Sequence, residues 1–229
     1  VSAGSSGTIT ADVDGDAISS ATTVGTTGFT ANATAASTAG SVIGIDDVGS
    51  AAVVGGEFIF GTTADITTNV GTAADRVTVS ATAATTTGNA DANALLTSNI
   101  GISETGDGQI QVGTSGTIAA GAFNTTNASA TTVTGTADAD ATITNASGID
   151  MATGASLITG QAATVSGTAN TSSTVVASAT TGAATADSVL AETSGAEIGI
   201  VSAGTSATIT GTDTATLSAS ATSVDAAAT

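Results

Sequence analysis

The sequence contains a long internal repeat whose copies are marked by the dipeptide Gly-Ile. This dipeptide occurs at Gly44-Ile45, Gly101-Ile102, Gly148-Ile149 and Gly199-Ile200, so its isoleucines lie 57, 47 and 51 residues apart. Two further glycines follow each copy, at Gly49, Gly106, Gly154 and Gly204 and then at Gly55, Gly113, Gly160 and Gly211. An aliphatic residue lies just before the second glycine of each copy, at Val54, Val112, Ile158 and Ile209. A period near fifty residues favours architectures in which similar units stack on one another.

The two ends of the chain carry the closest internal match. VSAGSSGTIT at residues 1–10 and VSAGTSATIT at residues 201–210 agree at eight of ten positions. The second segment directly follows Gly199-Ile200, so Val1 corresponds to a point just after a Gly-Ile pair. We therefore expect a single elongated repeat domain over residues 1–229, with five copies at about 1–43, 44–100, 101–147, 148–198 and 199–229.

Polar and aliphatic residues alternate with a period of two along much of the chain. The pattern is present at 8–10, 76–80, 109–112, 132–134, 142–144, 164–166, 208–210 and 215–218. Such alternation is typical of half-buried strands, and Thr and Val have high strand propensity. Helix is weakly supported, because Gly, Thr and Ser interrupt the Ala runs, leaving only 90–96 and 184–191 as candidates for a helical turn or two.

The sequence therefore predicts an all-β protein. We favour a β-solenoid (β-helix) of stacked short strands, because a core of Ala, Val and Thr fills only a narrow interior and the absence of Pro leaves backbone ladders uninterrupted. The alternative is a β-sandwich subunit with strand exchange between neighbours, although a sandwich core normally needs larger residues. A disordered Ser/Thr-rich stalk is a further alternative, and such stalks are usually rich in Pro.

The composition excludes several classes of function. The chain has no Cys and no His, one basic residue (Arg76) against 19 acidic ones, and a formal net charge of −18. Imidazole, thiolate and lysine chemistry are therefore excluded, and a nucleic-acid partner is not expected because such binding needs many cationic contacts. No stretch is long and apolar enough to predict a membrane span. We expect no enzyme activity; the remaining catalytic alternative is a carboxylate-pair hydrolase.

One local cluster has the chemistry of a metal site. Asp12, Asp14 and Asp16 alternate around Gly15, as in Asp-rich loops where carboxylate oxygens bind calcium and a glycine permits a tight turn. The bidentate Glu of an EF-hand is absent, and the other interpretation is a polar turn. Calcium is thus the one candidate ligand, and no cofactor is assigned with certainty.

Weaker candidates include other acidic residues and the lone cation. Asp46-Asp47, Asp138 and Asp140 would approach neighbouring carboxylates if repeats stack, and a cation would then relieve the repulsion. We expect Arg76 to form a salt bridge with Asp75 or Asp65.

Hydroxyl and amide side chains supply two further patterns. The pairs Thr8/Thr10, Thr132/Thr134, Thr142/Thr144 and Thr208/Thr210 fit the local Thr-x-Thr pattern of ice-binding arrays, although their spacing is irregular. Asn-x-Ser/Thr sequences occur at Asn32, Asn124, Asn127, Asn145 and Asn170, where glycosylation is permitted.

The Thr/Ala/Gly-rich, acidic, Lys-poor repeats resemble repeat regions of large prokaryotic surface proteins, including adhesins, S-layer-like proteins and extracellular filament proteins. The resemblance covers the whole chain but rests on composition and repeats, so it assigns no functional residues. It implies a secreted, extracellular or cell-surface structural protein. Because the sequence begins and ends within a repeat, we expect such a protein to self-assemble head to tail into a filament, fibre or surface layer. The alternative is an adhesin stalk or a ligand-binding module, with cell-surface glycans or ice as the partner.

Overall fold

All regular secondary structure in the described part of the chain is β-strand. The computed structural model describes residues 2–3, 6–23, 31–48, 57–106, 108–198 and 200–229. Each predicted alternating run falls within or beside a strand, and the two Ala-rich candidates for helical turns lie in strands as well. The all-β prediction is therefore confirmed. The described residues contain no helix long and apolar enough to cross a membrane.

The strands form three sheets, which we call A, B and C. Sheet A contains β1 (Ser2–Ala3), β5 (Glu57–Phe60), β9 (Gln109–Val112), β12 (Ser156–Thr159) and β16 (Ile200–Ser202). Sheet B contains β2 (Thr8–Val13), β3 (Asp16–Thr23), β6 (Asp65–Val70), β7 (Val77–Thr87), β10 (Thr117–Thr134), β13 (Thr164–Thr181) and β17 (Thr208–Ser223). Sheet C contains β4 (Ala33–Val48), β8 (Ala90–Thr105), β11 (Ala137–Met151), β14 (Ala184–Leu190) and β15 (Thr193–Glu197).

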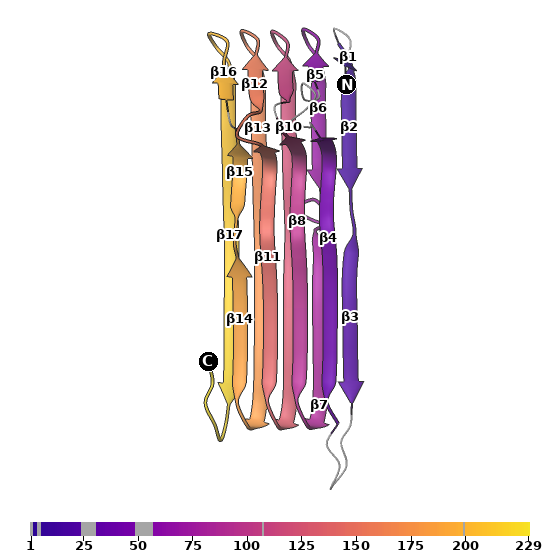
Figure 1. Cartoon of the computed structure of the whole chain (residues 1–229), viewed down its shortest axis with the longest axis vertical. Helices are drawn as coiled ribbons and strands as arrows, with labels where there is room; N and C mark the ends of the chain where they lie inside the picture. The colour runs from indigo at the N-terminus through magenta and orange to yellow at the C-terminus, as the bar shows by residue number, and fades with distance from the viewer. Residues whose placement is uncertain (1, 4–5, 24–30, 49–56, 107, 199) are drawn as a thin grey trace.

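Successive passes of the chain lie side by side. The chain runs from β10 in sheet B to β11 in sheet C and β12 in sheet A, and then returns to sheet B as β13, which pairs in parallel with β10. We call each such pass a rung. The described strand pairs between rungs are all parallel, as Figure 1 shows for the long strands. Parallel neighbours need long connections, and here the other two sheets supply them.

Equivalent residues of the five rungs form columns across the sheets. One column of sheet B contains Ile9, Ile66, Ile118, Val165 and Ile209, which are 57, 52, 47 and 44 residues apart. Thr8 and Thr10 occupy the same columns as Thr208 and Thr210. The alignment of the two end segments is therefore confirmed over their Thr-Ile-Thr residues, and sheets A and B each contain five rungs.

The Gly-Ile alignment is correct for three copies and wrong for the fourth. Ile45, Ile102 and Ile149 share a column, but its next member is Ala196 rather than Ile200. Ile200 instead pairs with Ser156 in sheet A. The fourth copy in this column begins at Gly195-Ala196, four residues before the expected boundary. Several positions used in the alignment lie outside the described residues, namely Val1, Gly49, Val54, Gly55 and Gly199.

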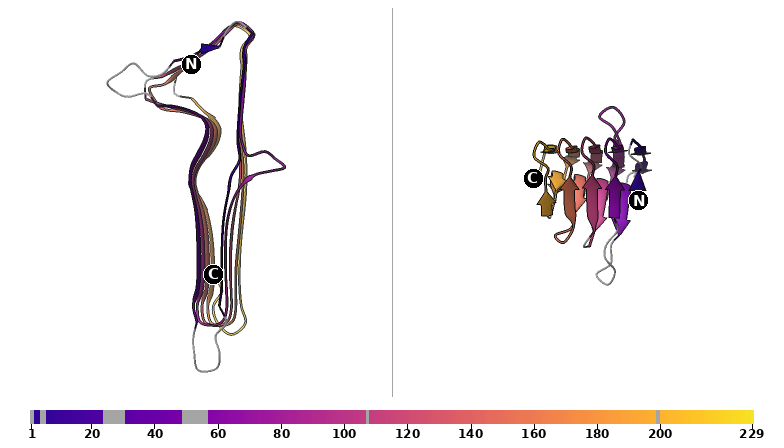
Figure 2. Two further views of the ribbon diagram at one scale, coloured as in Figure 1. Left: turned by 90° about the vertical axis from the view of Figure 1, so that its right-hand side faces the viewer. Right: turned by 90° about the horizontal axis from the view of Figure 1, so that it is seen from above.

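The glycines of this column allow sheets B and C to touch. A Cβ atom built on Gly148 would meet the backbone nitrogen of Thr168, and one on Gly101 would lie 3.0 Å from the nitrogen of Gly121. A Cβ on Gly195 would meet the nitrogen of Thr212. Figure 2 (left) shows the wall of sheet C bending toward the straighter wall of sheet B in the upper part of the molecule. We call Gly44, Gly101, Gly148 and Gly195 the glycine column. Gly101, Gly148 and Gly195 leave no room for a side chain at the contact with sheet B, whereas a Cβ on Gly44 would meet the backbone oxygen of Gly101 within sheet C.

The apolar core has two parts with different side chains. Where the three sheets meet, the core contains larger residues, including Ile66, Ile118, Ile149 and Leu157. Between sheets B and C alone, 17 of the 21 clustered residues are Ala. The predicted narrow interior is thus found in the two-sheet part, since Ala side chains let two sheets approach closely.

Candidate functional site

Asp12, Asp14 and Asp16 lie where the first rung passes from β2 to β3. All three are exposed, and each carboxylate has a different partner. Asp12 accepts a hydrogen bond from the Asn69 side chain (3.2 Å), Asp14 from the Gly15 backbone N–H (2.8 Å), and Asp16 from the Thr78 backbone N–H (3.0 Å). These three hydrogen bonds are consistent with the interpretation of the cluster as a polar turn.

A surface cavity of about 240 Å³ lies beside this turn. Its lining residues come from two rungs: Asp12, Val13, Asp14, Asn69, Gly71, Thr72 and Asp75. Asp16 is not among them, so the structure places only two of the three predicted ligands at the cavity and adds Asp75 from the neighbouring rung. In the part of the chain that the structure describes, no group of three or more acidic side chains is arranged to hold a metal ion. Calcium binding stays a prediction.

Stacking of rungs does bring carboxylates together on the outer face of sheet C. Asp138 pairs in register with Asp91, and Asp140 with Asp187. Burial raises the pKa of the Asp138 carboxyl above its usual range, and the charges of Asp91 and Asp187 raise it further. Burial also raises the pKa of Asp140, together with the charges of Asp138, Asp187 and Asp91. Of the pair Asp46-Asp47, Asp46 has Ser103 as its register partner, whereas Asp47 is paired in register with another acidic residue, Glu104.

These raised pKa values make folding more favourable in acid. A carboxyl whose pKa is higher in the folded chain binds protons more readily there, so its contribution to stability is full below the ordinary pKa near 3.8 and is lost as pH rises through the raised value. We expect the Asp138→Asn, Asp140→Asn double variant to raise Tm at pH 7 by about 1–3 °C and to flatten the rise in Tm on acidification. The expected shift is small because both groups remain largely solvated. Thermal unfolding between pH 4 and pH 7 measures it.

The matched control removes two charges elsewhere. Asp65→Asn with Asp225→Asn makes the same change in net charge at two exposed positions. If this control raised Tm by the same amount and flattened the profile equally, the effect would come from net charge and not from the stacked aspartates.

A second acidic group lies where β11 pairs with β15. Asp150 and Glu197 are register partners. A hydrogen bond with Glu192 is the largest cause that raises the pKa of the Glu197 carboxyl, followed by burial and by the charges of Glu192 and Asp150. Asp150 also accepts a hydrogen bond from the Asn145 side chain (3.0 Å). Protonation of Glu197 therefore reduces its repulsion with Glu192 and Asp150, as protonation of Asp138 and Asp140 does in the stacked aspartates.

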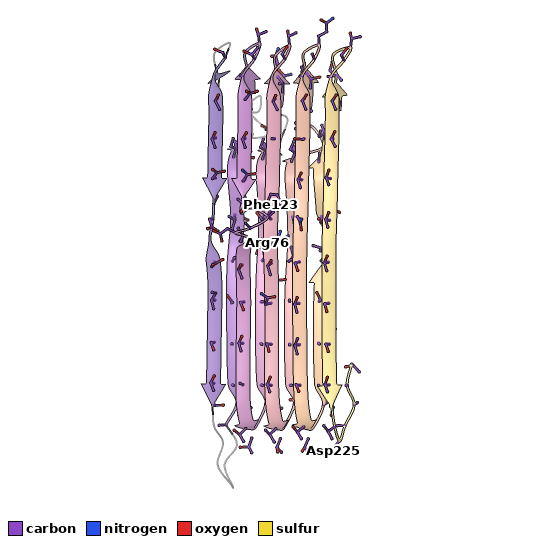
Figure 3. The ribbon with its side chains drawn as sticks, turned by 180° about the vertical axis from the view of Figure 1, so that it is seen from behind. Arg76, Phe123 and Asp225 are labelled. Carbon is purple, nitrogen blue, oxygen red and sulfur yellow. The ribbon has the colours of Figure 1, made fainter. Side chains whose placement is uncertain are left out.

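Arg76 does not form the expected salt bridge with Asp75 or Asp65. Its guanidinium reaches across two rungs of sheet B, donating to the backbone oxygens of Asn124 (3.1 Å) and Asn170 (2.9 Å). It also donates to the Asn170 side-chain oxygen (2.8 Å). Figure 3 shows Arg76 and Phe123 near the middle of this face. The several N–H donors of the guanidinium let Arg76 bind carbonyl groups of successive rungs. The residues next to Arg76 in the sequence gave no indication of these partners.

The outer face of sheet B is dominated by hydroxyl groups. On β17 every second residue from Thr208 to Thr222 is Thr or Ser, and all of these residues are exposed. The rows continue on β13 and, less regularly, on β10, as the sticks in Figure 3 indicate. The four Thr pairs noted in the sequence do not share this face, because Thr132 is buried and the pair Thr142/Thr144 lies in sheet C.

The asparagines of the Asn-x-Ser/Thr sequences differ in how accessible their side chains are in the fold. Asn124 is fully buried, so a glycan on it is incompatible with this fold. The side chain of Asn170 is held by Arg76, and that of Asn145 by Asp150. Asn32 is exposed and its side chain accepts a hydrogen bond from the Asn89 backbone. Asn127 lies on the outward side of β10.

A repeated turn between sheets B and C was not predicted from the sequence. The pattern Thr-Gly-x-Ala-x-Ala starts at residues 87, 134 and 181, with a spacing of 47 that was visible in the sequence. Gly88, Gly135 and Gly182 have φ values of 123°, 135° and 122°, which favour glycine. Their turns stack: the Gly88 N–H donates to the Thr134 oxygen, and the Thr132 hydroxyl donates back to the Gly88 oxygen (2.9 Å). These hydroxyl bonds connect neighbouring rungs at the corner.

Comparisons with protein-family models, with curated proteins and with solved structures found no match to this chain.

Proposed function

We propose that the chain is a β-solenoid that acts as a structural segment of an extracellular or cell-surface filament, fibre or layer, built by stacking of rungs. Support for the solenoid comes from the order of the strands, because each strand pairs in parallel with its equivalent one pass later. The sandwich alternative would lead us to expect antiparallel neighbours joined by hairpins. The resemblance to repeat regions of prokaryotic surface proteins supports the location.

The observation that carries the assembly proposal is the state of the outermost rung. Among the described residues, β17 pairs with β13 on one side only. Leu217 on its inward side is 45% exposed, whereas Val79 in the same column is 0% exposed. An unpaired parallel edge with exposed apolar residues can add another strand. The next rung can belong to the same, longer polypeptide or to another molecule, and in both cases it would pair with β17 in the same way.

The first rung has the residues to continue these columns. Its Thr8, Ile9 and Thr10 are identical to Thr208, Ile209 and Thr210 of the last rung and occupy the same columns. A second copy can therefore stack its first rung on β17 with side chains that already pack in this register. Such a contact joins different surfaces and does not close, so it propagates into a filament.

The test compares two lysine variants on β17. Leu217→Lys points a charge inward at the stacking edge and is expected to abolish head-to-tail assembly, while Ser218→Lys, on the outward side of the same strand, is expected to leave it intact. Sedimentation and negative-stain microscopy at rising protein concentration give the readout. Persistent monomers of the unmodified chain, with and without calcium, would contradict the proposal.

The hydroxyl rows of sheet B favour a second candidate, a ligand-binding module for glycans or ice. Residues 71–76 between β6 and β7 interrupt this face in the second rung, and Figure 2 (left) shows a loop projecting from the straight wall. A flat ligand would therefore be confined to part of the sheet. Glycan-array binding and thermal-hysteresis assays distinguish this candidate from a passive scaffold.

A further inference from the structure

Polar side chains fill one section of the interior, between the glycine column and the alanine-rich core. Along β10, Gly121 packs against sheet C, Asn124 and Thr126 follow, and Ala128 and Ala130 then enter the alanine-rich cluster. Thr171 on β13 occupies the column of Asn124, one rung further on. Asn99 on β8 lies between Leu96 of the alanine-rich cluster and Gly101 of the glycine column. We call Asn99, Asn124, Thr126 and Thr171 the interior polar group.

These side chains are buried, and their polar atoms form no hydrogen bond with the described part of the protein. Asn99, Asn124 and Thr126 are 0% exposed and Thr171 is 1% exposed. Neither the oxygen nor the nitrogen of the two amides, nor either hydroxyl, has a hydrogen-bond partner among the atoms of the residues that the structure describes. Each amide can make up to four hydrogen bonds and each hydroxyl up to three. Leaving such groups dry costs folding free energy, and buried polar groups in native proteins are nearly always satisfied.

We propose that the interior polar group binds a row of ordered water molecules that runs from rung to rung along the stacking axis. Water fits the chemistry because the group mixes donors and acceptors and contains no charge, so neither a cation nor an anion is favoured. The position fits too, since the glycine column closes the section on one side and the alanine-rich core closes it on the other. Asn124 and Thr171 are adjacent members of one column, about 4.8 Å apart along the axis, so one water can bridge them.

The primary test is water–protein magnetisation transfer by NMR on the ¹⁵N-labelled, unmodified chain. Waters with long residence should give cross-peaks to the side-chain amide protons of Asn99 and Asn124, with the sign expected for bound water. Cross-peaks between the two amides and the threonine hydroxyls, without any to water, would overturn the proposal, because they would indicate direct bonding among the side chains.

Two isosteric variants provide an independent readout. Thr126→Val with Thr171→Val removes two hydroxyls that hold water, so the cross-peak from Asn124 to water should weaken and Tm should fall by about 2–4 °C. Thr125→Val changes the neighbouring outward residue of β10 and should leave both unchanged. A higher Tm for the double variant would mean that the hydroxyls were dry, and would also overturn the proposal. If the double variant fails to fold, the measurement on the unmodified chain still decides.

Discussion

Gly148→Ala is expected to lower the free energy of unfolding by about 3 kcal/mol. The added Cβ would meet the backbone nitrogen of Thr168 and the backbone oxygen of Gly195. Backbone atoms of two packed sheets cannot turn aside as a flexible side chain can, so sheets B and C must separate at this rung. The separation also disturbs the contacts of Gly101 and Gly195, which lie in the same column. Denaturant unfolding followed by circular dichroism measures the change.

Gly40→Ala is the matched control for this variant. Gly40 also lies in sheet C, on β4, but a Cβ built there meets nothing within 4 Å. Alanine restricts the unfolded chain more than glycine does, so stability should stay the same or rise by about 0.5 kcal/mol. Equal losses for the two variants would contradict the assigned role of the glycine column, because they would indicate a general intolerance of alanine in these strands.

Ala139→Leu is expected to cost about 3 kcal/mol, at the upper end of the range for overpacking. Ala139 is fully buried, and its column in sheet C consists of Ala35, Ala92, Ala139 and Ala186. The inner face of sheet B has a matching column made of Ala21, Ala83, Ala130, Ala177 and Ala221. Three additional carbon atoms have no space between two walls of methyl groups.

The control for the core variant is Ala36→Leu, on the outward side of β4. Ala36 is exposed, so the same substitution should change stability by less than about 0.5 kcal/mol. A tolerated Ala139→Leu would show that the two-sheet part of the core expands easily, and the narrow interior would then not select for alanine. Thermal and denaturant unfolding of both variants give the comparison.

The strands and the stacking were predictable from the sequence, while part of the register was not. Alternation of Val77, Thr78 and Val79 predicts one buried and one outward face, because side chains on a strand alternate. The register of the fourth copy failed because only the glycine of Gly-Ile is required by the contact between sheets. The adjacent position accepts Ala196 in place of Ile149, so the dipeptide search selected Gly199-Ile200 instead.

The candidate sites were less predictable, because they depend on which rungs become neighbours. Asp138 lies two positions before Asp140 in the sequence, yet its register partner is Asp91, from one rung earlier. In the same way, Arg76 bonds to Asn170, 94 positions further along the chain. Sequence separations of this size follow from rung lengths of 44 to 57 residues. A search for local motifs therefore does not find such pairs.

The parallel ladders between rungs have a mechanical consequence. Hydrogen bonds between parallel strands point along the stacking direction, so a pull in that direction is shared by every ladder bond between two rungs at once. The length gained per residue is small, since a whole rung adds only about 4.8 Å along the stacking axis. A polymer of such rungs would therefore be short for its mass, broad in cross-section and resistant to tension.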